Sequence, residues 1–114
     1  MTVSERRSTQ RMPVDCKVSF FHLPPSSNSP TFRALNLSLT GACIEAPTPF
    51  APGAVLAFHL ITPEHQVADV RARVVHTILC APTLYHVGVR FTHLSADDHD
   101  LLARQLDRVG LNFQ

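Results

Sequence analysis

Apolar and polar residues alternate along several short segments, and this period of two limits the possible folds more than any other feature of the chain. The alternation is clearest in residues 14–23 and 67–79, and it recurs in residues 85–91. Successive side chains of an extended strand point to opposite faces, so each segment has the pattern of a half-buried strand. The side chains predicted to face the core in the first two segments are Val14, Cys16, Val18, Phe20, Ala68, Val70, Ala72 and Val74.

Three shorter strands are predicted at residues 31–38, 42–46 and 55–61, with proline- or glycine-containing stretches around them. The segment 67–79 is longer than a typical strand, which suggests that it bends or pairs with two neighbours. Residues 55–61 are too uniformly apolar to show a polar face, and the side chains expected to point inward there are Leu56, Phe58 and Leu60.

A helix is predicted at the end of the chain. Ser95 followed by Asp98 resembles a capping box, in which a serine side chain accepts a hydrogen bond from the first turn. Leu102, Leu106 and Val109 recur at helical spacing, and Gly110 is placed to end the helix. One amphipathic helix therefore closes the chain.

Six short strands followed by one helix predict a mainly β fold, either a small antiparallel barrel or a sandwich, with the helix on one side or over one mouth. A chain of 114 residues is enough for one such domain. Residues 1–12 are polar and lack periodicity, so we expect a flexible N-terminal arm, with the barrel and helix in residues 13–114.

The charge of the chain excludes several kinds of partner. The formal net charge is +1, whereas general nucleic-acid coat proteins and binders of anionic membranes usually carry a broad positive field. A small barrel that binds single-stranded nucleic acid would need exposed aromatic residues, but the chain has no tryptophan and one tyrosine. No apolar run approaches membrane-spanning length and no signal peptide is recognisable, so a cytoplasmic location is expected.

Nothing in the sequence predicts catalysis or a metal site. The seven histidines form no tight pair with another histidine or a cysteine at ligand spacing. The chain has no nucleophile elbow, no glycine-rich phosphate loop and no paired carboxylates on neighbouring strands. Cys16, Cys43 and Cys80 each lie in an apolar run and are predicted to be small buried thiols.

Two polar motifs are the candidate functional residues. The first is the arginine cluster Arg6, Arg7 and Arg11 in the arm, and the second is Asn36, Ser38 and Gly41 between two predicted strands. Strand alternation would direct Asn36 and Ser38 outward and the intervening leucines inward. Gly41 would remove a side chain where the chain turns or where a ligand approaches the backbone.

On these two motifs the chain resembles the PilZ domains, a family of bacterial receptors for cyclic di-GMP. The first family motif is an arginine pair, three variable residues and another arginine; the second is Asp or Asn, any residue, Ser, two residues and Gly. The resemblance covers nearly the whole chain and implies a six-stranded antiparallel β-barrel with one C-terminal α-helix. It also implies that Arg6, Arg7, Arg11, Asn36, Ser38 and Gly41 bind cyclic di-GMP.

The chemistry of these side chains suits that ligand. Cyclic di-GMP offers two phosphodiester anions and two guanines, and an arginine fork can bond both acceptors of a guanine edge. A guanidinium can also stack on a purine face. In the family, an arginine at the place of Arg6 accompanies binding of two stacked ligand molecules, so a mutually intercalated ligand dimer is expected.

The resemblance further implies an arm that orders over the ligand and an unidentified effector protein that receives the signal. The alternative is a PilZ-like protein that binds no nucleotide and serves a structural or interaction role, for example in type IV pilus assembly. A monomer or a weak homodimer fits either function. Arg71 is expected to be solvated, whereas Arg73 and Arg90 either line the pocket or are solvated.

Overall fold

The computed structural model describes residues 12–20 and 32–112, with the backbone alone for residues 109–112. Within the described residues, six strands precede one helix, as the alternation and the capping pattern predict. The elements are β1 (Met12–Phe20), β2 (Phe32–Leu37), β3 (Gly41–Ala46), β4 (Val55–Ile61), β5 (Val67–Ala81), β6 (Leu84–His93) and α2 (Ala96–Asn112). The first strand begins at Met12, which the sequence assigned to the arm.

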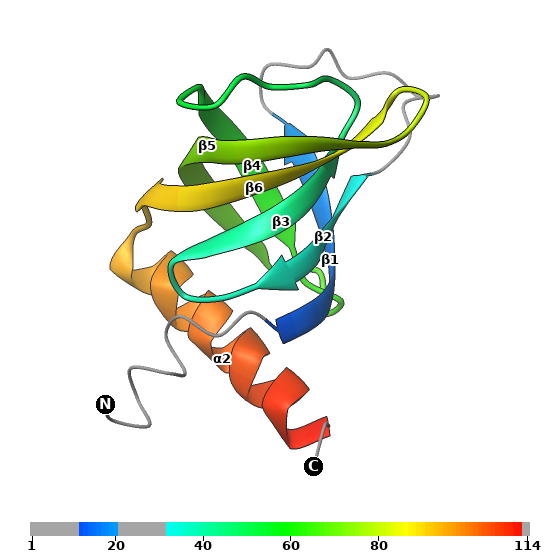
Figure 1. Ribbon diagram of the computed structural model, residues 1–114. Helices are drawn as coiled ribbons and strands as arrows, with labels where there is room; N and C mark the ends of the chain where they lie inside the picture. Colours follow the sequence, from blue (N-terminus) through cyan, green and yellow to red (C-terminus); the bar gives the residue numbers. More distant parts are fainter. Residues whose placement is uncertain (1–11, 21–31, 113–114) are drawn as a thin grey trace, which may run out of the picture.

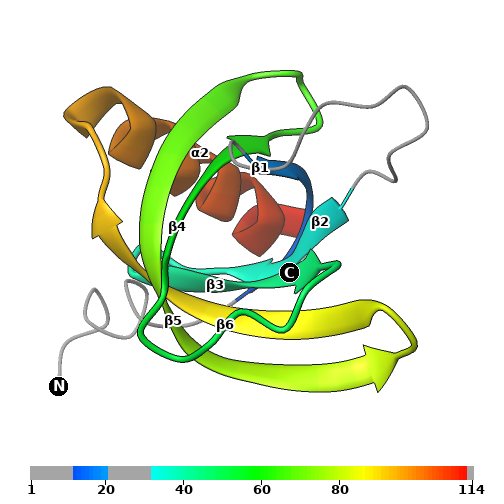
Figure 2. The ribbon, with the colours of Figure 1, turned by 90° about the horizontal axis from the view of Figure 1, so that it is seen from above.

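The strands form a closed antiparallel barrel in the order β1-β2-β3-β6-β5-β4, with β4 returning to pair with β1. Closure decides between the barrel and the sandwich that the sequence left open. Figure 1 shows α2 beneath the lower end of the barrel, and Figure 2 looks along the ring of strands with the helix behind it. The helix contacts β1 and β5, so it covers one mouth of the barrel.

The long strand β5 pairs with two neighbours, as its length suggested. Residues 67–73 pair with β4, and residues 71–81 pair with β6 through three shifts of register. The shifts are β-bulges or irregularities, which bend a strand and increase its twist. The far end of the β5–β6 hairpin extends beyond the barrel (Figure 1), and there Ile78 and Leu79 are 56% and 64% exposed.

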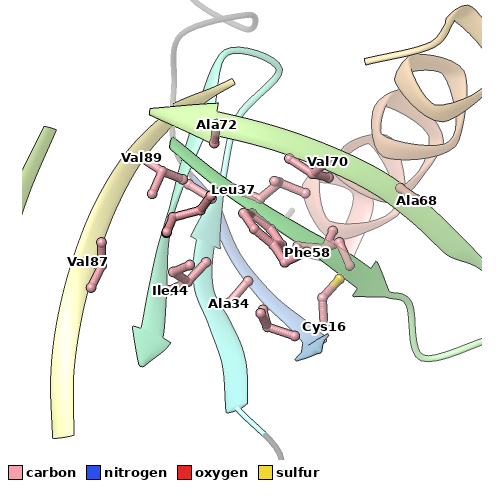
Figure 3. Close-up of a cluster of buried hydrophobic side chains, with 14 of the residues drawn as sticks. Cys16, Ala34, Leu37, Ile44, Phe58, Ala68, Val70, Ala72, Val87 and Val89 are labelled. Carbon is pink, nitrogen blue, oxygen red and sulfur yellow. The ribbon is translucent and has the colours of Figure 1, made fainter. Parts of the chain in front are cut away.

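The core fills the inside of the barrel, and on β1, β4 and β5 the side chains predicted to point inward line it. Phe58 is fully buried at its centre, among small side chains such as Ala34, Ala68 and Ala72 (Figure 3). Phe20 connects the core to the loop between β3 and β4. The centroid of its ring lies 6.0 Å from that of Phe58 in the core and 5.8 Å from that of Phe50 in the loop. Alternation of large and small residues is what fits side chains into so narrow a barrel.

The helix begins at the predicted cap but continues past the predicted end. The amide of Asp98 donates to Oγ of Ser95 over 3.1 Å, and Leu102 is fully buried against the barrel. We expected Gly110 to end the helix, but α2 runs to Asn112. A glycine within a helix costs about 1 kcal/mol, which disfavours the helix without ending it. Arg108 also forms an ion pair with Glu64 in the turn between β4 and β5.

The prediction that all three cysteines are buried is wrong for two of them. Cys16 is buried in the core, Cys43 is partly exposed and Cys80 is exposed, and none of them forms a disulfide. Cys43 lies on the outward side of β3, and Cys80 lies in the part of β5 beyond the barrel. An apolar run in the sequence therefore did not mean an interior position. Within residues 12–20 and 32–112, no helix is long and apolar enough to cross a membrane.

Replacing Phe58 with alanine should destabilise the barrel by about 3–5 kcal/mol, because the change leaves a cavity at the centre of the core. Urea unfolding of the wild type and the variant measures the difference. Val55→Ala is the matched control, since Val55 lies on the same strand and is 61% exposed. Equal losses in the two variants would contradict the central role of Phe58.

The stability should also fall at alkaline pH because of Cys16. Burial, and secondarily the charge of Asp15, raises the pKa of the Cys16 thiol from 9.0 to about 11. Between these values the unfolded chain loses a proton that the folded chain keeps, so rising pH favours unfolding. The free energy of unfolding should drop by about 2–3 kcal/mol more in the wild type than in Cys16→Ala between pH 8 and pH 11. Parallel pH profiles for the two proteins would contradict this assignment.

Candidate nucleotide-binding site

The turn between β2 and β3 is built around the side chain of Ser38. The amide of Ser38 donates to the carbonyl of Gly41 over 2.8 Å, as in a hairpin. In the other direction, Oγ of Ser38 accepts the amide of Gly41 over 3.1 Å and that of Thr40 over 3.2 Å. The hydroxyl thus replaces a backbone carbonyl, which is the usual reason for a serine at such a turn.

The expectation that Ser38 projects outward is therefore wrong. Its side chain is 1% exposed and lies within the turn, with Oγ also 3.1 Å from Oγ1 of Thr40. Strand alternation failed here because β2 ends at Leu37, so Ser38 follows the geometry of the turn. This serine holds the backbone of the turn in place.

Asn36 owes its position to an irregularity in β2. The pairing of β2 with β3 shifts between Ala34 and Asn36, and the buried residues are Ala34 and Leu37, which are three positions apart. An extra residue between two inward positions breaks the period of two and redirects a side chain. The Oδ1 atom of Asn36 accepts the amide of Cys43 over 3.2 Å, which holds the carboxamide against the outer side of β3.

The arm joins the barrel beside this turn. Met12, the first described residue of β1, pairs with Leu37, and Pro13 pairs with Asn36. Consecutive Cα atoms are about 3.8 Å apart, so the covalent chain attaches the arginine motif next to the second motif. Arg6, Arg7 and Arg11 themselves lie outside the described residues.

An outward row of residues continues from the turn across the sheet. Gly41 pairs with Arg90 on β6, and Arg90 pairs in turn with Arg73 on β5. In the described part of the chain, positive φ angles occur only at Gly53, His65 and Thr83, so Gly41 is not needed for its backbone conformation. What Gly41 does provide is an absence of side chain beside Arg90.

The arginines of this outer surface differ in their partners. Arg33 forms an ion pair with Glu45 over 3.2 Å, and Nη1 of Arg73 donates to the carbonyl of Gly53 over 3.0 Å. Arg90 is exposed, and within the described residues no carboxylate lies at ion-pair distance from it. Arg71 is also exposed, as expected, but it pairs with Ala57 and His93, farther from the turn. Arg90 is therefore the cation best placed beside the turn.

A second row runs parallel to the first. It joins Asn36, Cys43, Gly88 and His76, which are neighbours on β2, β3, β6 and β5. Gly88 is buried although its position faces outward, because the imidazole of His76 covers it. Together the two rows make an outer surface with a glycine in each.

Across residues 12–20 and 32–112, no group of three or more His, Cys, Asp and Glu side chains is arranged to hold a metal ion. His59 and Asp69 do pair, with Nε2 and Oδ1 2.9 Å apart on the outside of β4 and β5. That pair lies away from the turn of Ser38.

A family model described as PilZ domain matches residues 5–108 of the chain. The chain belongs to the PilZ family. The matched range contains both motifs and extends from the arm to the terminal helix, which confirms the resemblance that the motifs indicated.

Solved structures share the fold of this PilZ domain. One is the inhibitor of motility MotI/DgrA from Bacillus subtilis, with a TM-score of 0.68 and 16% identity, covering 90% of this chain and 50% of that one. This chain thus spans half the length of the Bacillus protein. Another is the PilZ domain of YcgR from Escherichia coli with c-di-GMP, with a TM-score of 0.61 and 16% identity, covering 94% of this chain and 93% of that one. A comparison with curated proteins gave no match.

Two residues of this outer surface were not assigned to the site from the sequence: the role of Arg90 was left open, and His76 was not considered as a site residue. Arg90 could not be assigned because its neighbour Gly41 is far away in the sequence and is brought close only by the register of β3 and β6. His76 was treated as one of several scattered histidines. The available signal was Gly88, a glycine within a strand pattern, which often marks a close approach.

Removing the hydroxyl of Ser38 should loosen the turn itself. Ser38→Ala leaves the amides of Thr40 and Gly41 without their acceptor, so we expect a loss of about 1–3 kcal/mol in the free energy of unfolding. Thr48→Ala, in the exposed loop after β3, is the control and should change the stability by less than about 0.5 kcal/mol. Urea unfolding decides; a Ser38→Ala variant as stable as the wild type would show that the hydroxyl is dispensable.

Proposed function

We propose that this PilZ domain is a receptor for cyclic di-GMP that binds the ligand between its arm and the outer surface beside the turn of Ser38. The observation that supports this most strongly is the register of the barrel. Met12 pairs with Leu37 and Gly41 pairs with Arg90, so the attachment of the arginine motif, the turn and an exposed cation adjoin.

The parts of the ligand divide among these groups by their chemistry. Arg6, Arg7 and Arg11 pair with phosphate and with guanine edges, since a guanidinium bonds two acceptors at once and stacks on purines. The carboxamide of Asn36 contacts a guanine or a phosphate from the outer side of β3. Ser38 acts by holding the turn, and Gly41 allows the ligand to approach the backbone.

Arg90 adds a further positive charge to the same site. Arg90 is exposed and pairs with Gly41, so its charge is available to a phosphodiester bound beside the turn. Cations outside the arm favour binding before the arm has ordered, because they attract the anion to a preformed surface.

Binding orders the arm up to Arg11 over the barrel and creates a surface for an effector protein. The ordering lowers the affinity for the ligand but couples ligand binding to a new surface. With Arg6 in the place that accompanies two stacked molecules in the family, the bound form is an intercalated dimer of cyclic di-GMP.

Isothermal titration with cyclic di-GMP tests this function. The wild type should bind two ligand molecules per chain, whereas Arg7→Ala and Arg90→Ala should each raise Kd by about tenfold or more through loss of a charge-assisted contact. Cyclic di-AMP should bind far more weakly, because its base edge presents a donor where guanine presents an acceptor.

Arg71→Ala is the matched control for Arg90→Ala, since both arginines are exposed on the outer face of the same pair of strands. Its affinity should equal that of the wild type. A folded wild type that gives no heat with cyclic di-GMP would overturn the receptor function and direct attention to constitutive protein partners. A stoichiometry of one would overturn only the ligand dimer.

A further inference from the structure

His76 lies flat on the outside of the barrel, in the row that begins at Asn36. A Cβ placed on Gly88 would overlap Cε1 of His76 and would lie 2.7 Å from both Nδ1 and Nε2. A point beyond the edge of the ring would be much farther from the two nitrogens than from Cε1. Because both nitrogens are only slightly farther from this point than Cε1 is, the point lies against the face of the imidazole near Cε1. Gly88 therefore lies under that face.

The missing side chain of Gly88 is what permits this position. Gly88 has no positive φ angle, so its backbone does not require a glycine. Any other residue would push the imidazole away from the strand. One face of the ring thus rests on the backbone of β6, and since His76 is exposed, the other face points away from the barrel.

This ring lies at a distance from the turn that suits a dinucleotide. Strands are about 4.8 Å apart, and Asn36, Cys43 and Gly88 are successive neighbours across β2, β3 and β6. The imidazole over Gly88 is therefore about 10 Å from Asn36, two strand spacings away. Arg90 lies two residues along β6 from Gly88, so a cation adjoins the platform.

We propose that the imidazole of His76, held flat by Gly88, is a stacking platform for the purine base of cyclic di-GMP that lies farthest from the turn of Ser38. This inference rests on the proposed function and adds to it a contact outside both motifs. A flat aromatic face with its opposite side fixed is well suited to a base, because a purine stacks on it with little loss of side-chain freedom.

The test is isothermal titration with cyclic di-GMP of the wild type, His76→Ala and His76→Phe. His76→Ala should raise Kd by about tenfold, the usual effect of removing one stacking ring, and His76→Phe should keep most of the affinity. His59→Ala is the matched control, because His59 is an outward histidine on β4, and it should bind as the wild type does.

Gly88→Ala tests the platform without removing the ring. The new Cβ displaces the imidazole, so this variant should lose affinity as His76→Ala does. In His76→Ala the space over Gly88 is empty, and adding Gly88→Ala there should cause no further loss. Additive losses would overturn the platform, as would unchanged affinity of His76→Ala.

A measurement on the wild type protects the test against variants that fold poorly. The ring protons of His76 should shift upfield in the NMR spectrum when cyclic di-GMP is added, because a stacked purine shields them. Unshifted ring protons in a protein that binds the ligand would overturn the platform alone. No binding by the folded wild type would overturn the receptor function itself, so the two failures are distinguishable.

Discussion

The pairing of β4 with β1 closes the barrel, and the rest of the structure depends on that closure. A closed sheet has a fixed inner volume, which the core fills by combining Phe58 and Leu60 with alanines on the facing strands. Closure also leaves one mouth for α2 to cover with Leu102. The outer surface is then fixed in register from β2 to β5, so that a side chain on one strand has a defined neighbour on the next.

The candidate site uses this fixed register together with two departures from regular strand geometry. An irregularity in β2 separates Ala34 from Leu37 by two residues and places Asn36 on the outer side. The turn that follows is held by the hydroxyl of Ser38 in place of a backbone carbonyl. Both departures cost regular pairing locally, and both lie next to the start of β1, where the arginine-rich arm joins the barrel.

Two glycines give this surface its shape, and neither does so through backbone flexibility. Gly41 is the cross-strand neighbour of Arg90, and Gly88 lets the imidazole of His76 lie on the strand. At Gly88 the space that the missing side chain leaves is occupied by the imidazole of His76 on the next strand. A cation and an aromatic side chain are thus held close together on the outer wall of the barrel.

The sequence by itself determined the strands, the helix and the two motifs, because these depend on local periodicity and on short spacings. It could not determine how Ser38, Arg90 and His76 are placed. Ser38 is buried within a turn, whereas alternation predicted that it would be exposed. Arg90 and His76 are candidate site residues because they pair with Gly41 and Gly88 on neighbouring strands. Cross-strand register joins residues far apart in the chain, and a shift of one residue would exchange the two faces of a strand. Only the closed tertiary structure fixes that register.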